Sequence, residues 1–114
     1  MKLAHITIHT NKAQEMIEFY KTYVGLDIVR AFGNITFIGN GEESETLLEI
    51  IADDNIQYNG KGLSIGFGCS DLEGKREELI KGGFRPTELI SPNPMVKFFF
   101  VEDPCGLTVQ FISQ

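Results

Sequence analysis

The sequence predicts an α+β fold in which two βαβββ modules follow one another in a single chain. The first observation is a change of period, because short segments of alternating apolar and polar residues are interrupted twice by apolar residues at helical spacing. The second is that the same order of segments recurs after about fifty residues, and an internal repeat is stronger support than any single element. We therefore expect modules at about residues 1–52 and 62–114, joined by a polar connector at about 53–61.

The first module opens with an alternating strand at residues 3–9. A helical segment is expected at residues 11–24, since Asn11 with Gln14 fits a capping box at its start and Gly25 is a natural stop. Three further strands are expected, at residues 27–32, 34–38 and 46–51.

The second module repeats this order, beginning with a strand at residues 62–69. Ser70 with Glu73 fits a capping box, and the helix that follows runs to about Lys81, where two glycines end it. Three more strands are expected, at residues 86–90, 95–102 and 107–112.

The last two strands are joined by the turn sequence Asp103-Pro104-Cys105-Gly106, which predicts a hairpin. Pro104 presets φ for the first central turn position, and Gly106 tolerates a positive φ. Gln110 lies in the middle of a mostly apolar strand, as Glu49 does in the first module. Since a buried polar group without a partner is costly, both side chains require an explanation.

Composition and charge exclude several classes of function. The net charge of −6 argues against nucleic acid and anionic membranes as partners. The chain has no apolar run of about eighteen residues and no signal-peptide pattern, so we expect a cytoplasmic protein. Cys69 and Cys105 do not form a disulfide framework and are expected to be free thiols.

Several motifs of the chain belong together: Leu3-Ala4-His5, Glu18-Phe19-Tyr20 followed by Val24-Gly25-Leu26, and Phe100-Val101-Glu102-Asp103-Pro104 with Gly106. With the repeat, they resemble the vicinal-oxygen-chelate superfamily of glyoxalase I, extradiol dioxygenases and bleomycin-resistance proteins, and short bacterial glyoxalase-I-like proteins look most similar. The resemblance covers nearly the whole chain. It implies that the modules form a cupped mixed sheet with helices on its convex side and a divalent metal in the cup.

The resemblance also implies where metal ligands would lie. His5 and Ser64 occupy the same place in the first strands of the two modules, and Glu49 and Gln110 the same place in the last strands. His5, Glu49 and Gln110 are the candidate ligands of Ni, Zn, Co or Mn, and Glu49 is the candidate catalytic base. Glyoxalase I usually has His at the third position and Glu at the fourth, so we expect metal binding to be weak or absent. Ser64, Thr7 and Thr108 are expected to line the pocket.

Two features have an alternative interpretation. His5 and Glu49 could form an ion pair without metal, with Gln110 hydrogen-bonded to another polar side chain. One face of the strand at 62–69 carries only Ser64 and glycines, which fits close approach of a ligand or packing at a subunit interface.

The function expected from the resemblance is a glyoxalase-I-like small-molecule protein, a lyase or isomerase of the lactoylglutathione-lyase type with a degenerate metal site. The first alternative is a metal-free ligand-binding protein of the bleomycin-resistance type. An extradiol dioxygenase is a weaker alternative, because it needs two His and one carboxylate on iron, and only one His lies at a motif position. A small-molecule ligand and a second copy in a homodimer are the expected partners. Module pairing within one chain or swapped between two chains remains open.

Overall fold

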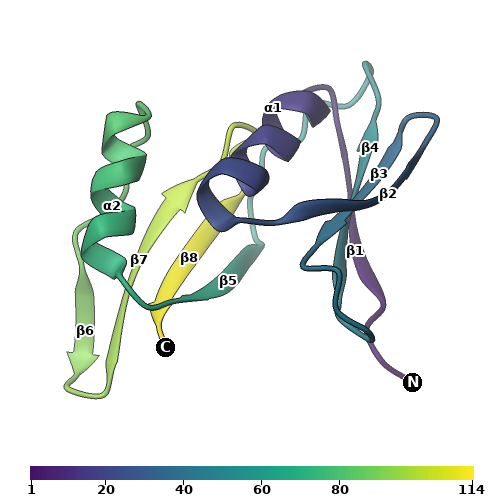
Figure 1. The fold of residues 1–114 in the computed structure, drawn as a ribbon. Coiled ribbons are helices and arrows are strands. Elements are labelled where there is room, and N and C mark those ends of the chain that lie inside the picture. The colour runs from purple at the N-terminus through teal and green to yellow at the C-terminus, as the bar shows by residue number, and fades with distance from the viewer. The chain divides into compact units, whose positions relative to one another are not determined.

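A computed structural model describes residues 1–114, which divide into two compact units, Met1–Tyr58 and Asn59–Gln114. The division falls inside the segment at 53–61 that the sequence suggests as a connector. Each unit contains a four-stranded mixed sheet built in βαβββ order (Figure 1). The predicted α+β class with two repeated modules is therefore confirmed. None of the helices combines the length and the apolar character that crossing a membrane requires.

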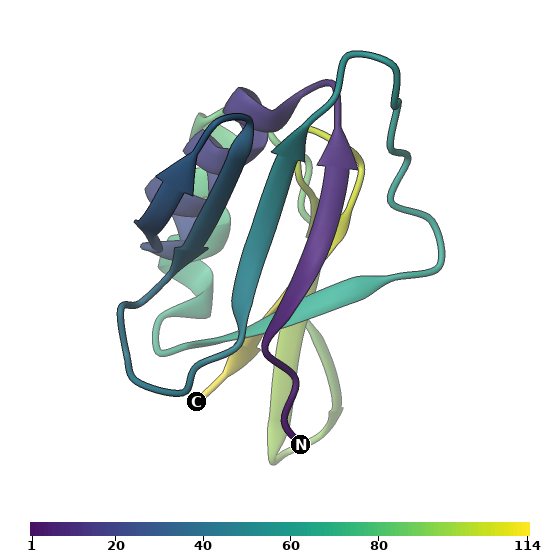
Figure 2. The same cartoon turned by 90° about the vertical axis from the view of Figure 1, so that its right-hand side faces the viewer.

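The sheet of the first unit has the order β1-β4-β3-β2. Its first and last strands run parallel, which Figure 2 shows as two neighbouring arrows of the same direction, and the other pairs are antiparallel. The four strands are β1 (His5–Thr10), β2 (Asp27–Phe32), β3 (Ile35–Gly39) and β4 (Leu47–Ala52).

The helical segment of this unit differs in detail from the prediction. It begins as α1 (Ala13–Phe19) and ends as the π-helical segment η1 (Tyr20–Val24). Gly25, with a φ of 82°, ends it as predicted. The expected capping box at Asn11 is wrong, because Lys12 is the N-cap residue and has no side-chain cap bond.

Side-chain alternation gives this sheet two different faces. Ile8, Ile38 and Ile50 point to one face and are at most 3% exposed. They form the core with α1, whose buried residues are Met16, Ile17 and Phe19. The opposite face carries His5 and Thr7 of β1 and Glu49 of β4, and this arrangement positions the candidate site.

The second unit has the corresponding strand order, β5-β8-β7-β6. Its strands are β5 (Ser64–Cys69), β6 (Ile90–Asn93), β7 (Val96–Glu102) and β8 (Thr108–Ser113). Helix α2 (Leu72–Lys81) contacts β7 and β8. Its cap lies one residue later than the predicted capping box, since the side chain of Asp71 accepts the N–H of Gly74 at 3.0 Å. The core of this unit contains Phe99 and Phe111, whose stacked rings have 5.3 Å between their centroids.

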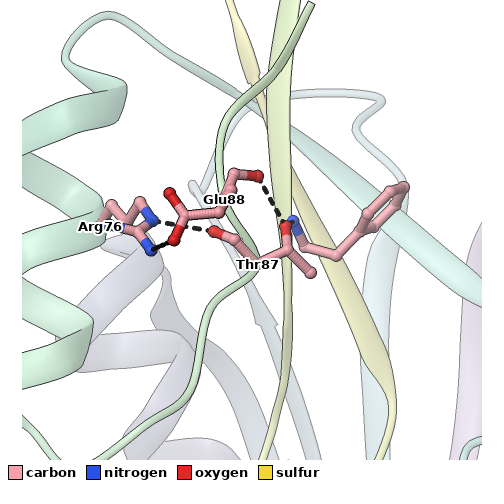
Figure 3. A network of polar contacts seen from close by, with 4 residues as sticks. Arg76, Thr87 and Glu88 are labelled. Atoms are coloured by element: carbon pink, nitrogen blue, oxygen red, sulfur yellow. Dashed lines mark hydrogen bonds and ion pairs between the residues drawn. The ribbon is translucent and has the colours of Figure 1, made fainter.

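The predicted strand at 86–90 is wrong, because β6 begins only at Ile90. Thr87 explains the difference (Figure 3). The N–H of Thr87 donates to the carbonyl of Phe100 at 2.8 Å. In return, the N–H of Phe100 donates to the side-chain hydroxyl of Thr87 at 3.0 Å, whereas in a regular ladder it would donate to the Thr87 carbonyl. The Thr87 carbonyl accepts instead from Nε of Arg76 on α2, at 2.8 Å. The hydroxyl therefore replaces a backbone acceptor, and the regular ladder does not extend through Thr87.

The predicted hairpin between β7 and β8 is confirmed. The N–H of Asp103 donates to the carbonyl of Leu107 at 2.9 Å, and Gly106 has a φ of 88°. The Asp103 carboxylate, only 5% exposed, accepts the N–H groups of Cys105 and Leu107 at 2.8 and 3.0 Å. This turn places Gln110 directly opposite Phe100. Both cysteines are free thiols, as predicted.

Candidate functional site

The strand registers show how the predicted site residues correspond in the two units. Thr7 lies opposite Glu49 in the first unit, and Gly66 lies opposite Gln110 in the second. His5 precedes Thr7 by two residues, as Ser64 precedes Gly66. The pair His5 and Glu49 therefore lies at the same place in the first sheet as the pair Ser64 and Gln110 in the second. The first pair belongs to one unit and the second pair to the other. A joint site made by both pairs remains a prediction.

In the first unit, His5, Thr7 and Glu49 lie close together on the sheet face opposite α1. The hydroxyl of Thr7 donates to Oε1 of Glu49 at 2.5 Å. Nε2 of His5 lies 3.5 Å from the same oxygen. The Glu49 side chain is 13% exposed and the His5 side chain 45% exposed, so the carboxylate is held in place while the imidazole remains accessible. A polar contact with one partner this exposed contributes little to stability.

An aromatic side chain adjoins these polar groups. Phe37 lies opposite Glu49 in the register, and its ring meets the imidazole of His5 edge-on, with 5.6 Å between centroids. The guanidinium of Arg30 lies 4.4 Å from the centroid of Phe37, a cation–π contact. No pattern in the sequence indicated Arg30 or Phe37 as site residues. Only the strand register, which pairs Arg30 with Phe37 and Phe37 with Glu49, brings them beside the site.

In the second unit, the glycine-rich face of β5 is occupied by glutamine side chains of the same unit. A methyl group at Gly66 would lie 3.1 Å from Oε1 of Gln110, and one at Gly68 would lie 2.8 Å from Cδ of Gln114. The lack of side-chain volume at these two positions of β5 thus leaves room for the two glutamine side chains. Close approach to another part of the same unit explains the glycines.

A pocket of about 290 Å³ opens near Gln110 in this unit. Thr108, one of the predicted lining residues, is part of its wall, as is Phe100, the register partner of Gln110. The other lining residues are Arg85, Thr87, Val101 and Glu102. Arg85 and Glu102 were not predicted from the sequence, because no periodic pattern distinguishes them from ordinary surface charges.

The residues at the four predicted ligand positions do not fit a strong metal centre. Only His5 and Glu49 offer an imidazole and a carboxylate, the groups that bind first-row metals well. Ser64 and Gln110 offer a hydroxyl and a neutral amide. No part of the chain brings together three His, Cys, Asp or Glu side chains in a way that could hold a metal ion.

The fold and the site together place this protein in the class of α+β proteins built from two βαβββ repeats, with polar residues at equivalent places in the first and last strand of each repeat. A family model described as the Glyoxalase/Bleomycin resistance protein/Dioxygenase superfamily matches residues 2–111. The chain belongs to this superfamily, which confirms the family resemblance. No curated protein matches the sequence.

Solved structures show the same fold. The trypanothione-dependent glyoxalase I of Leishmania major is similar with a TM-score of 0.82 and 20% identity, over 99% of this chain and 86% of that one. An antibiotic-binding protein from a Streptomyces species has a TM-score of 0.78 and 14% identity, over 99% and 95% of the two chains. The lactoylglutathione lyase of Agrobacterium tumefaciens has a TM-score of 0.69 and 14% identity, over 98% and 92%.

Proposed function

We propose that this protein binds a small organic molecule on the open sheet face of its first unit, without a tightly held metal. The observation that carries this proposal is the engagement of Glu49, whose Oε1 accepts from Thr7 at 2.5 Å and lies 3.5 Å from His5. Protein groups therefore already engage one of the two carboxylate oxygens. Any divalent metal bound by His5 and Glu49 alone would be held weakly.

The groups on this face are suited to recognising a polar ligand. Oε2 of Glu49 makes no hydrogen bond within the protein, so it can accept one from a ligand. His5 is nearly half exposed and can donate or accept beside it. Phe32, which is 55% exposed and lies 6.3 Å from the Phe37 ring, offers an apolar contact on the same sheet. Small-molecule binding is also a property of other members of the superfamily, as the antibiotic-binding neighbour illustrates.

Ligand screening by NMR with chelator-treated protein tests this proposal. Compounds that bind should shift the amide signals of Thr7 and Glu49 in the presence of EDTA. Glu49→Gln should weaken their binding, while Glu43→Gln, which removes the same charge from an exposed loop position, should leave it unchanged. Binding that occurs only after addition of Ni²⁺, Zn²⁺ or Co²⁺ would contradict the proposal.

The second candidate function is lyase or isomerase activity of the lactoylglutathione-lyase type. The observation that favours it is the position of the Glu49 carboxylate, fixed by Thr7 beside an imidazole 3.5 Å away. A carboxylate positioned in this way can take a proton from a substrate and return it. The formation of lactoylglutathione in the presence of added Ni²⁺ or Co²⁺ is the assay, and Glu49→Gln should abolish any activity observed. Activity that survives this substitution would exclude Glu49 as the base.

A further inference from the structure

The pocket near Gln110 in the second unit has a wall that is held rigidly in place. The segment that carries Arg85 and Thr87 is not a regular strand, yet Thr87 is bonded in both directions to Phe100 on β7, at 2.8 and 3.0 Å. Arg76 on α2 ties the same segment from the other side, donating to the Thr87 carbonyl at 2.8 Å and pairing with Glu88 at 3.3 Å (Figure 3). This network fixes the backbone next to Arg85, so the pocket wall is pre-formed.

Two opposite charges in this pocket have no partner in the protein. Arg85 and Glu102 both line it, both are exposed, and neither makes a hydrogen bond or ion pair with its side chain. They are not paired with each other either, although other basic residues of this unit, Lys75, Arg76 and Lys97, each have an acidic partner. The pocket therefore presents a separate positive and negative charge to a ligand.

The remaining lining groups add an aromatic ring and a hydroxyl group to the pocket. Phe100 is half-buried and meets the ring of Phe98 edge-on at 5.4 Å, so its position is fixed. The side chain of Thr108, on β8 opposite Glu102, adds a hydroxyl group. A volume of about 290 Å³ is at the lower limit of small-molecule sites, which suits the head group of a small compound.

We propose that this pocket binds a small zwitterion with an α-amino and a carboxylate group, such as a free amino acid. The carboxylate would pair with the guanidinium of Arg85, whose planar donors match it. The ammonium group would pair with Glu102, and the ring of Phe100 would contact the apolar part of the ligand. A simple anion is disfavoured because Glu102 repels it, and a simple cation because Arg85 does. This inference goes beyond the proposed site at Glu49, because it assigns a ligand class to a separate pocket in the second unit.

Calorimetric titration with phenylalanine and two of its derivatives tests the proposal. Phenylalaninamide keeps the ammonium group but lacks the carboxylate, and N-acetylphenylalanine keeps the carboxylate but lacks the ammonium group. The wild-type protein should bind phenylalanine at least about tenfold more tightly than either derivative, as expected for the loss of one charge-assisted pair.

Variants assign each charge to its residue. Arg85→Gln should weaken the binding of phenylalanine about tenfold and leave that of phenylalaninamide unchanged or tighter. Glu102→Gln should weaken the binding of phenylalanine and leave that of N-acetylphenylalanine unchanged or tighter. Lys81→Gln and Glu77→Gln change the same charges at exposed positions of α2 and serve as matched controls.

Three results would overturn the inference: no saturable binding of phenylalanine, equal affinity for the three compounds, or unchanged binding by folded Arg85→Gln protein. The outcome is distinct from that of the Glu49 experiment. Ligands that shift Thr7 and Glu49 while phenylalanine fails to bind would refute only the pocket. Phenylalanine binding without any ligand at Glu49 would refute only the site in the first unit.

Discussion

Replacing Asp103 with alanine should destabilise the protein by about 3 kcal/mol. The carboxylate is 5% exposed, and its Oδ1 accepts two backbone N–H groups, of Cys105 at 2.8 Å and of Leu107 at 3.0 Å. Both donors belong to buried residues, at 7% and 0% exposure, so water does not readily replace the lost acceptor. A hydrogen bond to a charged group contributes about 1.5–3 kcal/mol, and two bonds that share one oxygen should each lie at the lower end of this range.

Urea denaturation followed by circular dichroism measures this effect. With a slope of about 2 kcal/mol per molar urea, the midpoint should fall by about 1.5 M. Amide exchange at Cys105 and Leu107 should also accelerate, because these two N–H groups lose their acceptor. Asp103→Asn retains a side-chain oxygen at the same place and should lose less than half as much stability. A midpoint for Asp103→Ala within about 0.3 M of wild type would refute the reasoning.

Three further predictions concern other parts of the chain. Gly60→Ala should be more destabilising than Gly62→Ala, as thermal melts can show. Both positions have positive φ, but only at Gly60 would the new methyl group lie 2.1 Å from a backbone oxygen, that of Gly106. The double variant Ser64→His with Gln110→Glu should bind Ni²⁺ much more tightly than wild type in calorimetry, since it presents two imidazoles and two carboxylates. Equal affinity in a folded double variant would show that the predicted ligand positions do not converge. The protein should also form a homodimer, because unprotected sheet edges tend to be covered. Sedimentation that shows only monomer at micromolar concentration would contradict this.

Those features of the fold that depend on neighbours along the chain could be predicted from the sequence. Alternation and helical spacing are properties of consecutive residues, so the two helical segments, the repeat and all strands except the one expected at 86–90 followed from them. The hairpin at Asp103 to Gly106 was predictable for the same reason, because its turn chemistry is local. The correspondence of His5 with Ser64 and of Glu49 with Gln110 followed from the repeat and is reproduced by the strand registers.

Contacts between residues distant in sequence were decided only by the tertiary structure. Thr7 holds Glu49 across a parallel strand pair, 42 residues away, and no periodicity indicates that partner. The strand expected at 86–90 fails because Arg76, on a packed helix, takes the Thr87 carbonyl and leaves the hydroxyl to accept the N–H of Phe100. In both cases a side chain forms a hydrogen bond with a group that is distant in sequence: Thr7 with the Glu49 carboxylate, and Arg76 with the Thr87 carbonyl. Only folding brings these groups within hydrogen-bond distance. The sequence by itself therefore determined which chemical groups are available and on which strands they lie, whereas packing decided which of them are already engaged and which, like Arg85 and Glu102, remain free for a ligand.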